Sequence, residues 1–549
     1  MKVSQILILI MMASFSLLLI KAYKLQVMEH DVHSSFIESL ESRIKDIPPL
    51  RGRIKLDDGT ILAWDEILYV ADAWGMSIPE KIKKKLERIV GREKAMKLLL
   101  GEKILVSKGE AELLKSFGIK VSEKIVRRYE NLAPHVIGYI GSEREGISGV
   151  EKAYDEVLKG QKGSELVVID PSGKELGKVV EVPPIPGKDV VLTLKKELQE
   201  FAEKVLKEAG KAGVIIVSNP KTGEIYALAS FPSFDPNTFT GEMFYRKWLR
   251  MKNDPKAPLL NRAISALYPP GSSIKPLYAL AFLLDNGDPN EGIVCKGRFA
   301  YKNKEGKTVA IYKDWKISGH GFVDLRKALR VSCNVYFYQL GLKLGIEKMK
   351  KMASLLRLDD KTGIDLPGEV RGIFPSPSWK MEKYGEPWYP GDTILLSIGQ
   401  GYILLTPIEM LNLISFIANR GKVFKPHVVK KVGKEYIKPK VILSMDIKKD
   451  VWDYLIKALK DVTSFPGDEN EDPGTAYKAF KDFDHPVAGK TGTAETSQDK
   501  PHSWFIGFSP VENPEVAIVV LIEKGGYGSE MAAPIARQVL DLYFKLKSH

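Results

Sequence analysis

The sequence predicts an α+β protein in which a single N-terminal transmembrane helix precedes two folded parts. Three observations lead to this prediction: an apolar N-terminal run, a Pro-rich break at Pro183–Gly187, and strands at both ends of the helical region beyond that break. Strands that enclose helices in this way are typical of a sheet built from both ends of one domain. We therefore expect an anchor over residues 1–24, an elongated α+β part over 25–186 (the pedestal), and a sheet flanked by helices over 187–549.

Composition sets the broad class. The 549 residues are 44% hydrophobic and 28% charged, which are globular proportions and exclude a disordered, collagenous or polytopic membrane protein. Only two cysteines are present, so a disulfide scaffold is excluded as well. The net charge is +13, but Lys and Glu alternate over residues 81–93 as on a solvated helix. We therefore expect no nucleic-acid partner, and attraction to an anionic envelope or membrane surface fits the charge better.

The apolar run favours an uncleaved membrane anchor. Ile6–Ile20 is interrupted only by two serines, and extended back to Val3 it reaches the short end of the ~17–25 residues that span a bilayer. A cleaved signal peptide would need a small-x-small site after the run, and Lys21-Ala-Tyr-Lys-Leu-Gln offers none. A buried core helix is the other alternative. An anchor would leave nearly the whole chain on one side of the membrane, although the flanking lysines do not fix its orientation.

The pedestal is expected to mix helices and strands. Residues 25–47 look helical, residues 53–63 alternate like strands around a turn, and charged helices are expected over 79–118. Residues 163–192 are expected to form strands divided by turns, the last of them at Pro183–Gly187. That Pro-rich turn is the predicted boundary.

The part that follows begins with a helix over 195–209 and a hairpin of Gly213–Ser218 with Glu224–Ser230. Two apolar strands, Trp504–Phe508 and Val516–Ile522, precede a terminal helix that starts near Ala532. Long helices are expected between them, over 275–286, 322–345, 406–420 and 448–463. The sheet should therefore join the two ends of this domain.

Three short motifs carry chemistry. Ser272 and Lys275 are three residues apart, so on a helix their side chains lie on one face, and the preceding Pro-Pro-Gly places Ser272 at a helix N-terminus. Ser332-Cys-Asn334 is the only Ser-x-Asn in the chain. Lys490-Thr-Gly-Thr has small neighbours that suit an edge strand open to a substrate backbone, whereas the Lys-Thr-Gly copies at 221 and 361 fit a turn and a loop.

In this order the three motifs resemble the active-site motifs of penicillin-binding proteins and class A β-lactamases. Further segments are similar to class B penicillin-binding proteins over nearly the full length: Arg51-Gly-Arg-Ile, Asp58-Gly-Thr-Ile-Leu-Ala, His135-Val-Ile-Gly-Tyr-Ile-Gly, Gly146-Ile-Ser-Gly-Val-Glu, Ser397-Ile-Gly-Gln-Gly-Tyr, Leu405-Thr-Pro and His502-Ser-Trp-Phe-Ile-Gly-Phe. Others resemble the elongation branch, penicillin-binding protein 2: Tyr268-Pro-Pro-Gly, Asp314-Trp-Lys, Gly319-His-Gly and Trp388-Tyr-Pro-Gly-Asp. Ser273 and Ile274 depart from the commoner Thr and Phe or Val, which leaves the chemistry intact.

The resemblance implies a peptidoglycan D,D-transpeptidase of wall elongation and rod-shape maintenance, which is a target of β-lactams. Ser272 would attack the penultimate carbonyl of a D-Ala–D-Ala stem peptide, release D-Ala and pass the acyl group to an amine of a neighbouring stem. Lys275 can serve as its base only when neutral, and burial together with a nearby Lys490 cation would lower its pKa. No cofactor is needed for this chemistry.

The resemblance also assigns the remaining site residues. Ser332 would relay protons to the leaving amine, and Asn334 would hold the substrate amide and Lys275. Thr491 and Thr493 would grip the terminal carboxylate, and the amides of Ser272 and Thr493 would form the oxyanion hole. Gly492 would leave room for the substrate backbone.

Two cysteines bracket possible metal ligands. Cys295, Asp314, His320 and Cys333 make a plausible set for a structural zinc, and some elongation-type relatives are thought to carry a metal here. A Cys295–Cys333 disulfide and a pair of buried thiols are the alternatives. Because Cys333 lies inside the Ser-x-Asn motif, a metal would brace the catalytic turn.

Two other functions are compatible with the sequence. A hydrolytic relative, either a β-lactamase or a D,D-carboxypeptidase, could use the same motifs, although the anchor and pedestal argue against a compact released β-lactamase. A penicillin-sensing receptor or a scaffold would be non-enzymatic. The family resemblance implies a membrane-bound protein that faces the periplasmic side of the inner membrane and pairs with a SEDS-type glycosyltransferase through the anchor and pedestal.

Overall fold

The computed structural model describes residues 3–24, 26, 41–169, 175–240, 244–496 and 500–548. The chain forms two compact units, of which one comprises residues 1–51 with 159–187 and the other 52–158 with 188–549. The division expected at residues 186–187 stays a prediction.

The first unit contains helix α1 (Val3–Tyr23) and a three-stranded antiparallel sheet in the order β1 (Glu41–Ile47), β6 (Gly163–Ile169), β7 (Glu175–Val182). The helix expected over 25–47 is wrong at Glu41–Ile47, because this segment pairs along its whole length with β6, and such long-range pairing overrides local helical preference. The rest of that expected helix lies almost entirely outside the described residues.

No helix within the described ranges meets the combined requirements of length and apolar character for a bilayer-crossing segment. The anchor over residues 1–24 stays a prediction.

The N-terminal part of the second unit confirms the expected strands and charged helices. Strands β3 (Ile61–Asp72) and β5 (Lys120–Tyr129) form a long antiparallel pair that β2 (Ile54–Lys55) and β4 (Ile104–Val106) extend. Helices α3 (Glu80–Val90), α4 (Arg92–Leu99) and α5 (Lys108–Ser116) bury a small core of their own against this ribbon. Helix α5 begins at a capping box between Ser107 and Glu110, which satisfies two N-terminal amides.

A buried charge network fastens this ribbon to the segment that follows it. The Arg127 guanidinium contacts Glu151 at 2.8 Å and Asp65 at 3.3 Å, and it donates to the Gly52 carbonyl at 2.8 Å. Arg144 contacts the second oxygen of Asp65 at 2.5 Å. Buried charges need such partners, because each one has lost its hydration.

Removing the central cation of this network is expected to destabilise the protein strongly. In Arg127→Ala the buried Glu151 carboxylate loses its guanidinium, which costs about 3–5 kcal/mol of unfolding free energy for a buried pair. The neighbouring Arg128 forms a half-exposed pair with Glu66, so Arg128→Ala should cost about 1 kcal/mol or less. Denaturant unfolding of the two variants makes the comparison, and equal losses would contradict it.

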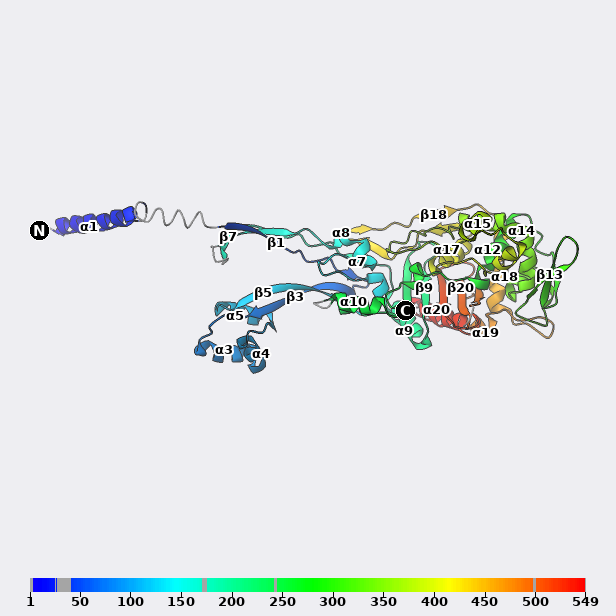
Figure 1. The fold of residues 1–549 in the computed structure, drawn as a ribbon, viewed down its shortest axis with the longest axis horizontal. Coiled ribbons are helices and arrows are strands. Elements are labelled where there is room, and N and C mark those ends of the chain that lie inside the picture. The colour runs from blue at the N-terminus through cyan, green and yellow to red at the C-terminus, as the bar shows by residue number, and fades with distance from the viewer. Residues whose placement is uncertain are drawn as a thin grey trace. The chain divides into compact units, whose positions relative to one another are not determined.

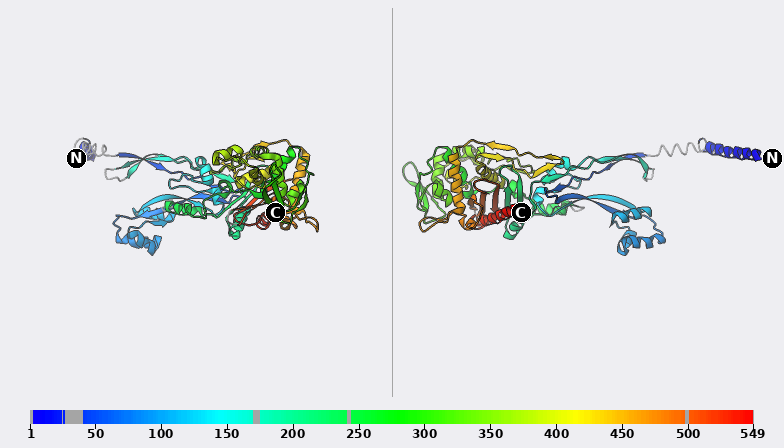
Figure 2. Two further views of the ribbon diagram at one scale, coloured as in Figure 1. Left: turned by 45° about the vertical axis from the view of Figure 1, so that its right-hand side comes forward. Right: turned by 180° about the vertical axis from the view of Figure 1, so that it is seen from behind.

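The larger part of the second unit is built on a five-stranded antiparallel sheet in the order β10 (Ile225–Phe231), β9 (Gly213–Ser218), β21 (Val516–Ile522), β20 (His502–Ser509), β19 (Ala488–Ala494). Every residue of β9 and β21 is buried, because helices cover both faces of the sheet. Helices α9 (Lys196–Ala209) and α20 (Ala532–Lys547) pack on one face, and α12 (Lys275–Leu284) and α17 (Pro407–Ala418) pack on the other (Figures 1 and 2).

Two expectations about this sheet are confirmed. Its strands come from both ends of the domain, and β19, which carries Lys490, is an edge strand. The helix expected over 322–345 is instead two helices, α13 (Leu325–Arg330) and α14 (Asn334–Leu355). The break falls at Ser332, whose φ of +58° is left-handed and cannot continue a helix.

The remaining elements form the connections and a few small sheets. The helices are α6 (Pro134–Ile137), α7 (Gly149–Ala153), α8 (Asp155–Leu158), η2 (Pro236–Phe239), α10 (Phe244–Lys252), α11 (Arg262–Ser265), η3 (Gly271–Ile274), α15 (Pro377–Tyr384), α16 (Pro390–Leu396), α18 (Lys449–Ser464) and α19 (Tyr477–Phe480). The strands are β8 (Val190–Leu192), β11 (Ile293–Cys295), β12 (Arg298–Lys302), β13 (Thr308–Lys313), β14 (Gly321–Val323), β15 (Lys422–Phe424), β16 (Val429–Val432), β17 (Glu435–Tyr436) and β18 (Val441–Ser444).

Candidate active site

Ser272 lies in the tight turn η3, which runs directly into α12. Its side chain lines a cavity of about 400 Å³. The turn approaches strand β19 closely because Gly271 has a φ of +54° and no side chain. A Cβ at this position would lie 2.6 Å from the Thr493 carbonyl oxygen. Glycine here thus allows the backbone that carries Ser272 to lie against β19.

Lys275 joins the first two motifs. Its fully buried amine donates to the Ser332 carbonyl at 2.9 Å and to Asn334 Oδ1 at 2.8 Å, and it lies 3.4 Å from Ser332 Oγ. Burial lowers the pKa of Lys275 to about 8. The amine can therefore exchange a proton near neutral pH.

The turn at Ser332 has an unusual backbone conformation, and Asp314 holds the residues that follow it. Ser332 is left-handed between α13 and α14, a conformation that is uncommon for a residue with a side chain and is often found at functional sites. The carboxylate of Asp314 accepts from the amides of Asn334 at 2.8 Å and Val335 at 3.1 Å, at the first turn of α14. This pair of hydrogen bonds fixes the turn from outside the motif.

Lys490 begins the third sequence motif and is the second lysine of the site. Its amine is fully buried in β19 and donates to the Thr491 carbonyl at 3.0 Å. Burial, together with repulsion from Lys275, lowers the pKa of Lys490 well below its ordinary value. The repulsion is mutual, so the two buried amines disfavour each other's charged form.

The strand after Lys490 alternates between the cavity and the protein interior. Thr491 and Thr493 line the cavity, and Thr493 Oγ1 accepts from the Gly528 amide at 3.2 Å. A Cβ on Gly492 would instead lie 2.9 Å from Trp504 Cβ and 3.0 Å from the Pro270 carbonyl oxygen. Protein atoms therefore lie where a side chain at this position would be, and the expectation that Gly492 leaves room for the substrate backbone stays a prediction.

The cavity thus gathers Ser272, Ser332, Asn334, Thr491 and Thr493, and the buried Lys275 and Lys490 lie behind them. Sequence reasoning missed six other residues of its lining: Trp315, Thr475, Glu495, Tyr527, Ser529 and Glu530. Trp315 could have been found, since it follows Asp314 in a quoted motif. The others come from loops that carry no pattern of their own.

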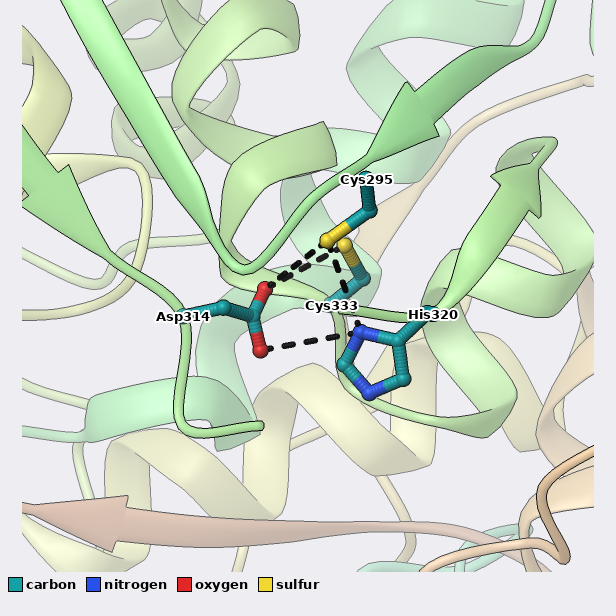
Figure 3. A group of neighbouring side chains, drawn as sticks. All are labelled: Cys295, Asp314, His320 and Cys333. Carbon is teal, nitrogen blue, oxygen red and sulfur yellow. Dashed lines mark hydrogen bonds and ion pairs between the residues drawn. The ribbon is translucent and has the colours of Figure 1, made fainter. Parts of the chain in front are cut away.

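The four candidate metal ligands are buried and converge (Figure 3). Their ligand atoms all lie within 4.8 Å of one another, and neither cysteine is in a disulfide. Asp314 Oδ2 lies 3.3 Å from Cys333 Sγ and 3.7 Å from Cys295 Sγ, and His320 Nδ1 lies 3.7 Å from Cys295 Sγ. Tetrahedral zinc with bonds of about 2.0–2.3 Å separates its ligands by about 3.3–3.8 Å, so this donor set fits the ion.

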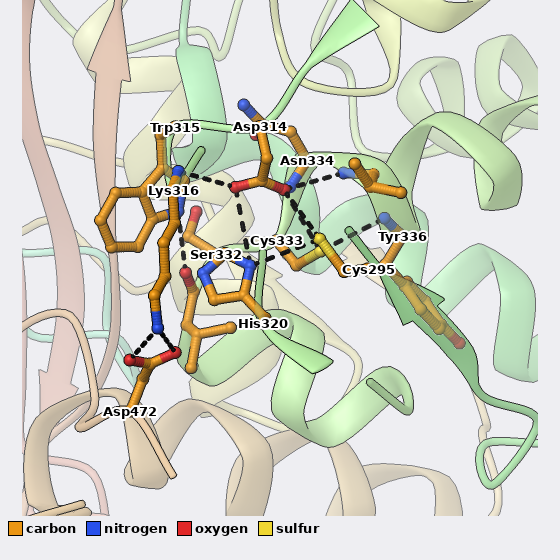
Figure 4. A network of polar contacts seen from close by, with 12 residues as sticks. Cys295, Asp314, Trp315, Lys316, His320, Ser332, Cys333, Asn334, Tyr336 and Asp472 are labelled. Atoms are coloured by element: carbon orange, nitrogen blue, oxygen red, sulfur yellow. Dashed lines mark hydrogen bonds and ion pairs between the residues drawn. The ribbon is translucent and has the colours of Figure 1, made fainter. Parts of the chain in front are cut away.

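The same group contacts the turn at Ser332 (Figure 4). Asp314 holds the amides of Asn334 and Val335, and Cys333 lies between Ser332 and Asn334. The Trp315 indole donates to the Val331 carbonyl at 3.1 Å, and Lys316 forms an ion pair with Asp472. The candidate metal group therefore sets the conformation of the backbone on which Lys275 depends.

Comparison with known proteins agrees with this arrangement. The family described as penicillin binding protein transpeptidase domain matches residues 213–541, and the penicillin-binding protein dimerisation domain matches residues 46–192. The peptidoglycan D,D-transpeptidase MrdA of Haemophilus influenzae is 33% identical, and the alignment covers 77% of this chain and 66% of the relative. MrdA of Acinetobacter baumannii is 31% identical, with 94% of this chain and 84% of the relative covered.

Solved structures are similar as well. A chain from a peptidoglycan synthase complex that coordinates polymerization and crosslinking superposes with a TM-score of 0.78 at 29% identity, covering 98% of both chains. Penicillin-binding protein 2 of Helicobacter pylori, in its complex with MreC, gives 0.74 at 28% identity and covers 93% of this chain and all (100%) of that one.

The fold, the three motifs and these matches define one class: the chain belongs to the penicillin-binding protein transpeptidase family. Within that family it is a class B protein of the penicillin-binding protein 2 type, the group of the peptidoglycan D,D-transpeptidases MrdA.

Proposed function

We propose that the cavity transfers peptidoglycan stem peptides through an acyl ester on Ser272. One observation carries this proposal. Lys275 begins α12, the helix that follows the turn η3 of Ser272. Its amine is hydrogen-bonded to the Ser-x-Asn turn, and burial lowers the pKa of this amine to about 8. A serine hydroxyl is a weak nucleophile, and a buried amine that is partly neutral near pH 7 is the base it needs.

The first half-reaction forms the acyl enzyme. Ser272 Oγ attacks the penultimate carbonyl carbon of a D-Ala–D-Ala end, and its proton passes to the neutral amine of Lys275. The amides of Ser272 and Thr493 stabilise the oxyanion. When the C–N bond breaks, the proton moves through Ser332 to the leaving nitrogen, and D-Ala departs. The products are an ester on Ser272 and a free amino acid.

The second half-reaction reverses the proton movements. A neutral amine of a neighbouring stem attacks the ester carbonyl and gives its surplus proton to the Lys275 site. That proton returns to Ser272 Oγ as the ester bond breaks. A new amide joins the two stems, and no cofactor takes part in this chemistry.

Binding of the donor end would use both walls of the cavity. The Asn334 side chain would hold the substrate amide, while Lys490, Thr491 and Thr493 would hold the terminal carboxylate. Lys490 has a lowered pKa in the ligand-free site, and an incoming carboxylate would favour its charged form. β-Lactams carry a carboxylate and a reactive amide carbonyl, so they should acylate the same serine.

The acylation rate is expected to rise with pH through about 8. The base must be neutral, and a lysine with a pKa of about 8 is mostly protonated below that pH and mostly neutral above it. Measuring the second-order rate of penicillin acylation from pH 6 to 9.5 tests this. The rate should gain about tenfold per unit on the acidic limb and level off above the pKa. A profile that is flat, or that falls with pH, would contradict the role of Lys275.

The product of the reaction separates transfer from hydrolysis. Purified protein incubated with a glycan strand that bears pentapeptides should release D-Ala and form cross-linked dimers, which mass spectrometry distinguishes from trimmed monomers. Free D-Ala without dimers would favour the D,D-carboxypeptidase alternative. Rapid turnover of a penicillin would favour a β-lactamase, and absence of both reactions in folded protein would favour a penicillin-sensing receptor or a scaffold.

We further propose that Ile6–Ile20 anchors the chain in the inner membrane, with the rest on the periplasmic side, for wall elongation and rod-shape maintenance. Support comes from the apolar sequence and from relatives found in a synthase complex and with MreC. The partner would be a SEDS-type glycosyltransferase that docks on the anchor and pedestal. Charge reversals in the pedestal that left glycan polymerisation by this partner unchanged would count against the docking.

A structural zinc is proposed for Cys295, Asp314, His320 and Cys333, in preference to a disulfide or two free thiols. Elemental analysis of purified protein should find about one zinc per chain, and chelation should lower the melting temperature. Both effects should vanish in Cys295→Ser. After unfolding and metal removal, thiol titration should find two thiols. Protein that contains no zinc, or a disulfide that resists this treatment, would refute the site.

A further inference from the structure

Thr475 lies in the loop after α18, and the fold holds it in place from several sides. The Gly474 amide donates to the Phe465 carbonyl at 2.9 Å, and the Ala476 amide donates to the Val462 carbonyl at 2.8 Å. A Cβ on Gly474 would lie 2.2 Å from the Asp461 carbonyl oxygen, so the loop packs against the end of α18 without any spare room. Thr475 thus occupies a fixed position at the cavity, although no sequence motif marks it.

From that position Thr475 connects the two walls of the active site. Its amide donates at 3.1 Å to the carbonyl of Arg330, two residues before Ser332. Its hydroxyl lies 2.7 Å from the hydroxyl of Thr491 on β19. Arg330 is itself held by Glu471 at 2.6 Å and stacks on Phe465 at 3.7 Å, so the anchoring carbonyl is also fixed. One residue therefore links the Ser-x-Asn turn to the Lys-Thr-Gly strand.

The hydrogen bond between the hydroxyls of Thr475 and Thr491 can run in either of two directions. Each has a single proton, and their contact uses one of them. Within the described ranges, Thr491 is the one hydrogen-bond partner of the Thr475 hydroxyl. If Thr475 donates, the Thr491 proton is free to point into the cavity. The reverse arrangement would present only lone pairs of Thr491 to an incoming anion.

We propose that Thr475 is a positioning residue that donates to Thr491 and thereby directs the Thr491 hydroxyl at the terminal carboxylate of the donor substrate. The inference rests on the proposed function, since it assumes a carboxylate bound at Thr491. In the chain Thr475 to Thr491 to carboxylate, both protons are used and each hydrogen bond polarises the next one. Thr475 does not touch the reacting atoms and acts through Thr491.

The experiment uses the full chain and two probes, benzylpenicillin and its methyl ester, which lacks the carboxylate charge. Thr475→Val keeps the shape but removes the hydroxyl, and Thr475→Ser restores it. We expect Thr475→Val to lower the second-order acylation rate for benzylpenicillin about tenfold, the size of one hydrogen bond to a charged group. The loss should appear as weaker binding rather than a slower acylation step. The rate for the ester should change less than twofold, and Thr475→Ser should behave like wild type.

A double substitution adds a second test. Thr491→Val should remove the hydroxyl that Thr475 is proposed to direct at the carboxylate. The double variant Thr475→Val with Thr491→Val should therefore react with benzylpenicillin no more slowly than Thr491→Val alone. Equal losses for acid and ester, or additive losses in the double variant, would overturn the proposal and leave only a structural role for Thr475. Thr475→Ala replaces the valine variant if that variant does not fold. Failure of wild type to be acylated would refute the proposed function itself, which is a distinguishable outcome.

Discussion

Replacing Lys275 with methionine is expected to lower the rate of acylation by a penicillin about a thousandfold. Methionine has a similar length and no charge, so it fits a buried position without leaving an ionised group there. What it removes is the base, and general-base catalysis contributes roughly 10²–10⁴-fold. The variant also loses the hydrogen bonds to the Ser332 carbonyl and Asn334 Oδ1, which adds to the effect.

A matched substitution separates this effect from loss of a lysine in general. Lys343 lies on α14, the helix that begins at Asn334, and forms a half-exposed ion pair with Glu291. Lys343→Met should therefore acylate at the wild-type rate. Stopped-flow acylation of the two variants and of wild type gives the comparison, and each melting temperature shows whether the fold persists. A Lys275→Met enzyme within about tenfold of wild type would exclude lysine as the base.

The pair Ser272 and Lys275 was predicted from its three-residue spacing together with the order of the three motifs and the family resemblance that this order carries. In the structure Ser272 lies in the turn η3, and Lys275 begins α12 directly after it. The strands β9 and β21 were predictable from local sequence. Both faces of the sheet are covered, so each strand is a nearly continuous run of apolar residues.

Features that depend on distant contacts could not be predicted. Strand β1 forms because β6, far along the chain, pairs with it. The left-handed Ser332 is held by Asp314 through the neighbouring amides, and no local signal marks that conformation. Thr475 reaches the cavity only because its loop packs on α18. In each case tertiary contacts decide the outcome, and a window of local sequence does not contain them.

The candidate metal group could be predicted only in part. Its four ligand types could be collected from the sequence, but irregular spacing left zinc, a disulfide and free thiols open. The structure brings the four ligand atoms within 4.8 Å of one another and keeps the thiols unpaired. It also connects the group to the Ser-x-Asn motif, since Asp314 accepts a hydrogen bond from the Asn334 amide.

Ser272→Ala is expected to abolish acylation altogether. No other hydroxyl combines a place in the cavity with a position at the start of the Lys275 helix, within the residues that the structure describes. The adjacent Ser273 provides a control, because its buried hydroxyl donates to the Pro270 carbonyl at 2.6 Å and does not line the cavity. Ser273→Ala should keep the chemistry and lose at most about 1–3 kcal/mol of stability, the cost of the unpaired carbonyl.

Acylation of Ser272 is therefore tested most directly by covalent labelling with a fluorescent penicillin, followed by mass mapping of the labelled peptide. We expect slow, stable labelling of wild type and Ser273→Ala on Ser272, and none in a folded Ser272→Ala protein. A label that persists in Ser272→Ala, or that maps to another residue in wild type, would contradict it.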